Sequence, residues 1–252
     1  MLQTRVIPCL LLKDDGLVKT IKFKNPAYIG DPINTVRIFN EKEVDELIFL
    51  DIQASVLNSE PNYKLLAEIA NECFMPLAYG GGLKKLDQVK RIFNIGLEKV
   101  AINTSACVNP NFITDIANLF GNQAVIASID VKKNFFGKNE VVYKSGSQKQ
   151  KLSPIEWAKE IENKGAGEIL LTSIDRDGTW SGYDLELIKS ITSVVNIPVI
   201  ANGGAGSIKH LVEGKKIANA SALALGSMVV YQKQGMGVLI NYPERKILEK
   251  EL

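Results

Sequence analysis

The chain has 252 residues, of which 46% are hydrophobic and 23% charged, and its formal net charge is +2. This length and apolar content predict one domain spanning residues 1–252. A nearly neutral total charge argues against nucleic-acid binding, which needs a clustered basic face, but it allows a small anionic ligand held at a local site.

The sequence contains few cysteine and histidine side chains, which limits the disulfides and metal sites that it can form. The three cysteines, Cys9, Cys73 and Cys107, show no CxxC spacing, and His210 is the single histidine. We therefore expect no disulfide, no structural zinc and no His-based metal site. The first residues do not form a secretory signal, and no stretch approaches the roughly 18 apolar residues of a membrane span. The expectation is a cytoplasmic protein without a membrane partner.

Eight short apolar runs alternate along the chain with longer amphipathic stretches of helical period. The runs cover residues 5–12, 46–52, 76–82, 99–105, 124–131, 168–175, 197–204 and 221–227. Strands buried on both faces are continuously apolar, and alternation with helices implies parallel crossovers. Eight repeats at this length predict the α/β class and a single (β/α)8 TIM barrel. The alternative is a doubly wound open sheet, but no GxGxxG turn follows the first run.

The two halves of the chain resemble each other at the strand positions. VIPCLLL (6–12) matches VIASIDV (125–131) at an offset of 119 residues. LIFLDI (47–52) matches ILLTSI (169–174), and VAINTS (100–105) matches ALALGS (222–227), both at an offset of 122 residues. The nearly constant offset predicts a duplicated half-barrel. Chance similarity among strands rich in Val, Ile and Leu is the alternative.

Glycine-rich turns follow several of the runs, where a barrel carries its active site. The first glycine cluster comprises Gly81, Gly82, Asn103 and Thr104, and the second comprises Gly178, Gly203, Gly204, Gly226 and Ser227. Such turns expose N–H groups that bind phosphate, aided by the positive end of a following helix. Two clusters predict a ligand with a phosphate at each end. Ordinary turn glycines are the alternative.

Charged residues also stand where the runs end. Asp130 closes the fifth run and Asp51 the second. Burial at the end of an apolar strand raises the pKa of a carboxyl group and suits it to proton transfer. We favour this role for Asp130 and a structural cap for Asp51. Lys19 lies in a long loop over residues 13–32; it reaches an anionic substrate if that loop closes as a lid, and is otherwise a solvated lysine.

Four further charged residues stand where apolar runs begin: Arg5, Glu46, Lys99 and Glu168. Two cations and two anions in these places could form a ring across the floor of the barrel. Because burying unpaired charge is costly, such groups should pair with one another. The alternative is four independent polar residues at strand entries.

A set of motifs carries a resemblance to a known family. They are GDP (30–32), DELIFLDIQAS (45–55), KVAINT (99–104), GAGEILLTSIDRDGT (165–179), SGYD (181–184) and GGAG (203–206). With them, nearly the whole chain resembles the cyclase subunit of imidazole glycerol phosphate synthase. The resemblance implies a (β/α)8 barrel with half-barrel symmetry and a glutaminase subunit docked under its floor. It also implies that ammonia from glutamine enters through four charged residues, crosses the barrel and meets a bisphosphorylated ribulosyl aminoimidazole carboxamide ribotide at the top. The implied products are imidazole glycerol phosphate and an aminoimidazole carboxamide ribotide.

The resemblance also implies roles for individual positions of this chain. The ammonia gate would be Arg5, Glu46, Lys99 and Glu168, with Glu98 and Gln123 near the partner or the gate. The phosphate sites would be Gly82, Asn103 and Thr104 on one side, and Gly178, Gly203, Gly204 and Ser227 on the other. Asp130 matches one of two catalytic aspartates, and Lys19 matches a loop lysine. The resemblance implies no cofactor.

One catalytic position departs from the family. The other aspartate belongs at position 11, where this chain has Leu11, although Lys13 and Lys19 keep the register on either side. Asp14 and Asp15 lie beyond the strand end. General acid–base groups typically contribute about 10²–10⁴ in rate, so the change predicts crippled ring formation with the fold, phosphate sites and ammonia path intact.

Three interpretations follow. AYGGG, ANGGAG, ALALGSM and GMGVLINYPERK resemble a diverged branch that works beside a glutaminase homologue and a separate amidotransferase acting on sugars of surface polysaccharides. In that setting the barrel relays ammonia. The second interpretation is a genuine cyclase of histidine biosynthesis. The third is a partner that binds a ligand and merely activates the glutaminase.

Overall fold

A computed structural model describes residues 4–252, and its centre is a closed barrel of eight parallel strands. In barrel order they are β1 (Arg5–Lys13), β4 (Leu47–Asp51), β5 (Leu77–Gly80), β6 (Lys99–Ile102), β7 (Val125–Lys133), β10 (Glu168–Ser173), β11 (Val199–Asn202) and β12 (Ala222–Leu225). Pairing of β12 with β1 and of β7 with β10 closes the ring. The predicted (β/α)8 barrel is confirmed, and the open sheet is excluded.

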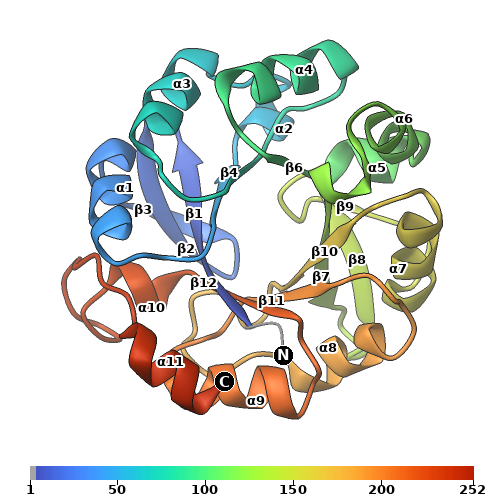
Figure 1. Cartoon of the computed structure of the whole chain (residues 1–252). Coiled ribbons are helices and arrows are strands. Elements are labelled where there is room, and N and C mark those ends of the chain that lie inside the picture. The colour runs from blue at the N-terminus through green and yellow to red at the C-terminus, as the bar shows by residue number, and fades with distance from the viewer. Residues whose placement is uncertain (1–3) are drawn as a thin grey trace.

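Helices surround the barrel as an outer ring (Figure 1). They are α1 (Pro32–Glu41), α3 (Tyr63–Glu72), α4 (Leu86–Ile95), α6 (Asn111–Phe120), α7 (Pro154–Asn163), α8 (Leu185–Thr192), α9 (Ile208–Lys216) and α11 (Arg245–Glu251). Shorter helices are α2 (Ala54–Leu57), α5 (Thr104–Val108), η1 (Asn122–Ala124) and α10 (Ser227–Val230). In the described part of the chain, no helix combines the length and apolar character that crossing a membrane requires.

Local sequence signals explain where several of these helices begin. The Asp31 side chain accepts a hydrogen bond from the Asn34 amide and caps α1, with Pro32 at the first helical position. Ser153 and Glu156 form a reciprocal capping box at the start of α7. These caps fix the point at which each chain segment leaves its loop and turns back along the barrel.

Buried apolar side chains form two separate layers. The larger layer packs between the strands and the outer helices and includes the bulky Trp157, Phe39 and Phe49. The smaller layer draws one or two residues from each of the eight barrel strands: Ile7, Cys9, Ile48, Ala78, Ala101, Ile126, Leu170, Ile200, Ala222 and Ala224. Because side chains alternate across a strand, this second layer lines the barrel interior. Four of its members are alanines, which keeps the interior side chains short.

Two hairpins extend the barrel at the carboxyl ends of β1 and β7. β2 (Gly16–Ile21) pairs antiparallel with β1 and with β3 (Lys24–Gly30). β8 (Asn139–Tyr143) pairs antiparallel with β7 and with β9 (Gln148–Lys149). Since β1 and β7 are the segments that match in sequence at an offset of 119 residues, the hairpins extend the likeness between the two halves.

The expectation of a long loop over residues 13–32 is wrong, because most of it forms the β2–β3 hairpin. Its two-residue turn consists of Lys22 and Phe23, with φ values of +53° and +61°. Such turns normally carry Asn or Gly, which tolerate positive φ. The sequence lacks that signal at these two positions, so the hairpin could not be predicted from its turn residues.

Candidate active site at the carboxyl ends of the barrel strands

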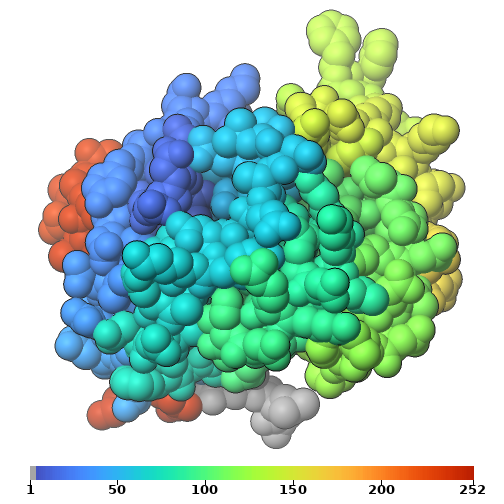
Figure 2. Space-filling model, turned by 90° about the horizontal axis from the view of Figure 1, so that it is seen from above, coloured from blue at the N-terminus to red at the C-terminus, as the bar shows by residue number. Residues whose placement is uncertain are grey.

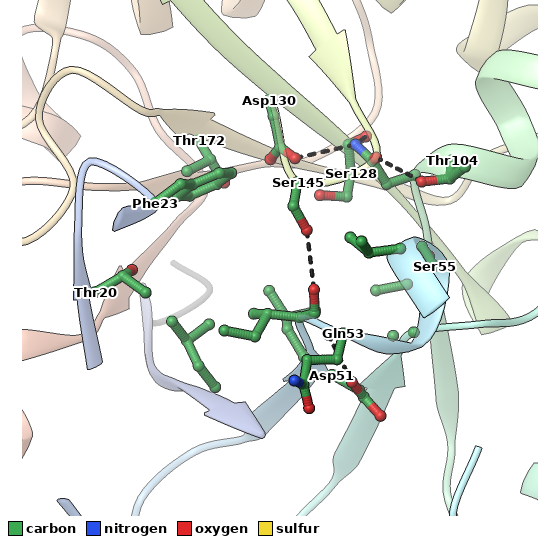
Figure 3. A pocket seen from close by; sticks show the side chains of 18 of the residues that line it. Thr20, Phe23, Asp51, Gln53, Ser55, Thr104, Ser128, Asp130, Ser145 and Thr172 are labelled. Atoms are coloured by element: carbon green, nitrogen blue, oxygen red, sulfur yellow. Dashed lines mark hydrogen bonds between the residues drawn. The ribbon is translucent and has the colours of Figure 1, made fainter. Parts of the chain in front are cut away.

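A cavity of about 310 Å³ lies at the carboxyl ends of the barrel strands. The strands are parallel, so residues that end different strands converge on this face. Polar residues lining the cavity are Lys13, Lys19, Thr20, Asp51, Gln53, Ser55, Asn103, Thr104, Ser105, Ser128, Asp130, Ser145, Thr172, Asp177 and Asn202. Figure 3 shows many of these side chains arranged around the open centre.

Asp130 lies near the end of β7 and is buried in the cavity wall. Asn103 donates a hydrogen bond from Nδ2 to Asp130 Oδ2 over 3.2 Å (Figure 3). Burial raises the pKa of Asp130 to about 7, against an opposing effect of the Thr172 hydroxyl. A carboxyl group with such a pKa can both take up and release a proton near neutral pH, as acid–base catalysis requires.

Lys19 points inward rather than into solvent. It is 8% exposed, and its Nζ donates to Asp177 Oδ1 over 2.8 Å. The hydroxyl of Thr20 donates to Asp177 Oδ2, also over 2.8 Å. The interpretation as a solvated lysine is therefore wrong, because the β2–β3 hairpin carries Lys19 into the cavity wall. No pattern in the sequence pairs Lys19 with Asp177, 158 residues away.

Leu11 stands in the wall of the same cavity, near the end of β1. The neighbouring carboxylates do not take its place. Asp14 lies in the β1–β2 turn, and Asp15 accepts a surface hydrogen bond from Asn62 over 2.8 Å. Deeper in the barrel, burial raises the pKa of the Cys9 thiol to about 12. A thiol with this pKa stays protonated near neutral pH and is a poor nucleophile.

Asp51 has the structural role that the sequence favoured. Its Oδ1 accepts hydrogen bonds from the amides of Gln53 and Ala54, each over 2.9 Å. These bonds hold the chain as it turns from β4 into α2. One of the two carboxylate oxygens is thus occupied by backbone donors, and Asp51 also lines the cavity.

The first glycine cluster lies in the cavity wall: Gly81, Gly82, Asn103 and Thr104 all line it. Gly82 has a φ of +67°, and a Cβ at this position would come within 2.6 Å of the Ser59 carbonyl oxygen. A side chain is therefore excluded there. Thr104 begins α5, and its hydroxyl accepts a hydrogen bond from the Lys144 amide over 3.2 Å.

The second glycine cluster is largely separated from this cavity. Gly226 lines it, whereas Gly178, Gly203, Gly204 and Ser227 do not. The β2–β3 hairpin covers part of the cluster: a Cβ on Gly178 would lie 2.4 Å from the Thr20 carbonyl oxygen, and one on Gly226 would lie 2.9 Å from Lys19 Cε. Four of the five residues of the second cluster therefore lie outside the cavity that the first cluster lines.

Arg5, Glu46, Lys99 and Glu168 meet at the opposite end of the barrel, and we call them the floor ring. Arg5 pairs with Glu46 and with Glu168, at 2.5 and 3.0 Å. Lys99 pairs with the same two carboxylates, each at 2.9 Å. Both glutamates are buried. The four charges alternate around a closed cycle, so each buried carboxylate has two cationic partners.

The cavity offers no group of metal ligands. Within residues 4–252, no three His, Cys, Asp or Glu side chains gather closely enough to hold a metal ion. The three cysteines are all free.

Comparisons with known proteins agree with the family resemblance that the sequence motifs indicated. A family model described as "Histidine biosynthesis protein" matches residues 5–235. The chain is 55% identical over 244 residues, 97% of each chain, to a Pseudomonas aeruginosa protein named "Putative imidazole glycerol phosphate synthase subunit hisF2". It is 49% identical, over 96% of each chain, to a Leptospira borgpetersenii protein named "Putative imidazole glycerol phosphate synthase subunit HisF". It is 43% identical, over 92% of each chain, to the "Imidazole glycerol phosphate synthase subunit HisF" of Alkaliphilus metalliredigens.

Proposed function

Because this chain belongs to the histidine biosynthesis protein family, we propose that it is the barrel subunit of a glutamine amidotransferase. A glutaminase subunit docks at the amino-terminal face, and ammonia crosses the barrel to the cavity at the carboxyl-terminal face. The observation that carries this proposal is the floor ring, a closed cycle of paired charges directly below an apolar interior. It provides an entrance that a rearranged ion pair can open.

The barrel interior suits ammonia as a neutral molecule. Above the floor ring its lining is apolar and rich in alanine. Moving an ion such as ammonium into this lining costs far more than moving a neutral molecule, so the interior favours unprotonated ammonia. Cys9, Leu50 and Ala101 both pack in the interior and line the cavity, so the apolar lining continues to the upper site.

The upper site supports delivery of ammonia better than ring formation within the barrel. Cyclisation in the family uses two aspartates, and here Asp130 stands with Leu11 instead of a second acid. In addition, most of the second glycine cluster lies outside the cavity, which disfavours a ligand held by a phosphate at each end. We therefore propose that ammonia passes on to a separate amidotransferase that acts on a sugar of a surface polysaccharide.

A genuine cyclase of histidine biosynthesis is the second candidate. It is favoured by Asp130, whose pKa of about 7 suits proton transfer, and by Lys19 and the first glycine cluster in the same cavity. The name of the Alkaliphilus metalliredigens relative points the same way. In this case Asp130 carries the acid–base chemistry without a second aspartate.

Complementation separates the two candidates. The chain is expressed in a bacterial strain that lacks its cyclase, together with the glutaminase subunit that belongs to the chain. The ammonia relay predicts no growth without histidine, although the purified chain still stimulates glutamine hydrolysis by that glutaminase. Robust growth without histidine would eliminate the relay in favour of the cyclase.

Variants of the floor ring test whether ammonia moves through the barrel. In the reconstituted complex with an ammonia acceptor, Lys99→Met should lower transfer of glutamine nitrogen to the acceptor relative to the rate of glutamine hydrolysis. If transfer and hydrolysis stay coupled as in the wild type, the barrel is not the conduit, and the chain only activates the glutaminase.

A further inference from the structure

Exposed apolar side chains stand on three elements that border the cavity. They are Ile21 and Tyr28 on the β2–β3 hairpin, Val56 and Leu57 on α2, and Phe135 and Phe136 on the β7–β8 hairpin, with exposed fractions of 46–97%. Val56 and Leu57 also line the cavity itself. Large apolar side chains exposed around one opening are typical of a surface that another molecule covers.

The β7–β8 hairpin is the most prominent of these elements. Phe135 is 97% exposed and Phe136 is 89% exposed, and their rings meet edge to face with centroids 5.6 Å apart. Figure 2 shows the yellow-green tip of this hairpin projecting at the same end of the molecule as the blue β2–β3 segment. The turn is built locally, because Asn134 Oδ1 accepts hydrogen bonds from the amides of Phe136 and Lys138. The pair of rings is therefore presented on an ordered turn.

The same two hairpins concentrate positive charge. Residues 16–30 contain three lysines and no acid, and residues 132–151 contain six lysines and one glutamate. Together these segments carry a formal charge of +8 in a chain whose total is +2, which leaves −6 for the remainder. One of the lysines, Lys19, is neutralised by Asp177. The nearly neutral total thus conceals two basic segments beside the cavity, although Asp14 and Asp15 in the adjoining β1–β2 turn offset part of their charge.

We propose that this apolar and basic rim is the docking surface for the enzyme that consumes the ammonia, a protein with acidic side chains around the entrance to its own active site. The inference rests on the proposed function. Ammonia that escapes into neutral water takes up a proton and ceases to be a nucleophile, so its acceptor has to cover the cavity mouth. The basic residues would orient an acidic partner, and the aromatic anchors would exclude water from the interface.

The arrangement fits a protein better than a membrane or a nucleic acid. A flat lipid surface would touch the projecting hairpin tips and leave Val56 and Leu57, which lie in the cavity wall, uncovered. A nucleic-acid duplex would neutralise the lysines, but its bases are stacked on one another and offer no comparable apolar surface for Phe135 and Phe136. A folded protein can fill the space between the hairpins and bury both kinds of side chain.

Crosslinking in cells tests the proposal with a defined probe. Phe136→benzoylphenylalanine is introduced into the full chain in the cells that naturally make it, and light then links the side chain to whatever covers it. The same replacement at Leu119, 51% exposed on α6, is the matched control. We expect the position-136 probe, and not the control, to link to an enzyme that uses ammonia and has an acidic surface.

A functional measurement completes the test. The crosslinked enzyme is purified and assayed with the chain and its glutaminase, with either glutamine or ammonium chloride as the nitrogen source. The double variant Phe135→Ser/Phe136→Ser should lower the glutamine-driven product at least about tenfold, as expected for loss of two aromatic anchors. It should leave glutamine hydrolysis and the ammonium-driven product unchanged, as should Leu119→Ser in every assay.

The possible outcomes separate this proposal from the one it rests on. Absence of a specific crosslink, a crosslink to lipid, nucleic acid or the glutaminase, or unimpaired transfer by the double variant would overturn the docking surface. A crosslinked enzyme that does not use ammonia would overturn it too. A different result would contradict the proposed function itself. In that case the crosslinked enzyme forms product with ammonium chloride, but the wild-type chain and its glutaminase supply it with no nitrogen from glutamine.

Discussion

Single positions decide what chemistry this barrel can perform. The offset of 119 residues that relates the two halves aligns Leu11 with Asp130 and Cys9 with Ser128, and all four residues line the cavity. One half therefore presents a buried carboxyl group where the other presents an apolar side chain. A reaction that needs one proton donor and one acceptor on opposite sides loses one of them, whereas passage of neutral ammonia requires neither.

The variant Leu11→Asp tests this interpretation directly. If the remaining site is competent, a second carboxyl group should raise ammonium-dependent formation of imidazole glycerol phosphate, within the roughly 10²–10⁴ range of an acid–base group. Leu50→Asp is the control, because Leu50 pairs with Leu11 on the adjacent strand and lines the same cavity. If Leu11→Asp gains nothing over this control, other substitutions have also disabled cyclisation.

Asp130 should make stability depend on pH. The pKa rises from 3.8 to about 7 on folding, so the folded chain holds a proton that the unfolded chain releases between these values. The free energy of unfolding therefore falls as pH rises through this window. Asp130→Asn removes that loss and should stabilise the protein at pH 8 relative to pH 5 by roughly 2.5 kcal/mol, since part of the loss has already occurred at pH 5. Urea unfolding of both proteins at the two pH values measures this, and an equal effect at both would contradict the raised pKa.

At the scale of elements, the β2–β3 hairpin decides the shape of the cavity. Asp177, in the segment after β10, holds this hairpin in place. Its carboxylate accepts hydrogen bonds from the side chains of Lys19 and Thr20, and its backbone carbonyl accepts one from the Lys22 amide over 3.0 Å. The contacts link a hairpin of the first half to a loop of the second. They also place the hairpin over Gly178, so the element that provides Lys19 covers part of the second glycine cluster.

The variant Asp177→Asn should loosen this hairpin. It leaves the buried Lys19 ammonium without its carboxylate, a type of change that typically costs 3–5 kcal/mol. We expect amide hydrogen exchange over residues 17–29 to accelerate by at least about tenfold, measured by mass spectrometry. Asp175→Asn is the matched control, since Asp175 accepts a hydrogen bond from the Lys133 amide instead. Equal exchange in the two variants would show that Asp177 does not anchor the hairpin.

For the whole molecule, closure of the barrel is what joins distant charges. The floor ring draws its members from the beginning of the first, second, fourth and sixth apolar runs, and Arg5 and Glu168 are 163 residues apart. Desolvation opposes burial of each charge, and the alternating pairs offset that cost. The ring thus ties together four sectors of the barrel while standing at the base of its apolar interior.

Lys99→Met tests how far the floor ring supports the fold. The variant leaves Arg5 as the one cationic partner of Glu46 and Glu168, so the free energy of unfolding should fall by about 3 kcal/mol. This is the lower end of the range for breaking buried ion pairs, because the Arg5 side chain is 30% exposed. Lys64→Met removes a distant, exposed pair with Glu68 and should change stability by less than about 0.5 kcal/mol. Chemical denaturation compares the two, and similar small losses would mean that the ring contributes little.

The order of elements could be predicted from sequence because it depends on neighbours along the chain. Continuous apolar runs, helical spacing and caps such as Asp31–Pro32 act within a few residues, and the eight repeats leave few other ways to bury the strands. Parallel strands then bring their ends to one face, so the positions of Asp130 and the first glycine cluster around a cavity follow from the strand pattern alone.

Which distant side chains meet depends on how the chain packs in three dimensions. The barrel, the candidate acid Asp130 and the apolar Leu11 could be recognised from the residues alone, but the β2–β3 hairpin could not, because its turn lacks the usual Asn or Gly. The burial of Lys19, its pairing with Asp177 and the covering of Gly178 all follow from where that hairpin packs. The physical reason is the distance along the chain over which each effect acts. Periodicity and capping act between residues that are close in sequence, whereas these contacts form only when barrel closure brings together segments more than 150 residues apart.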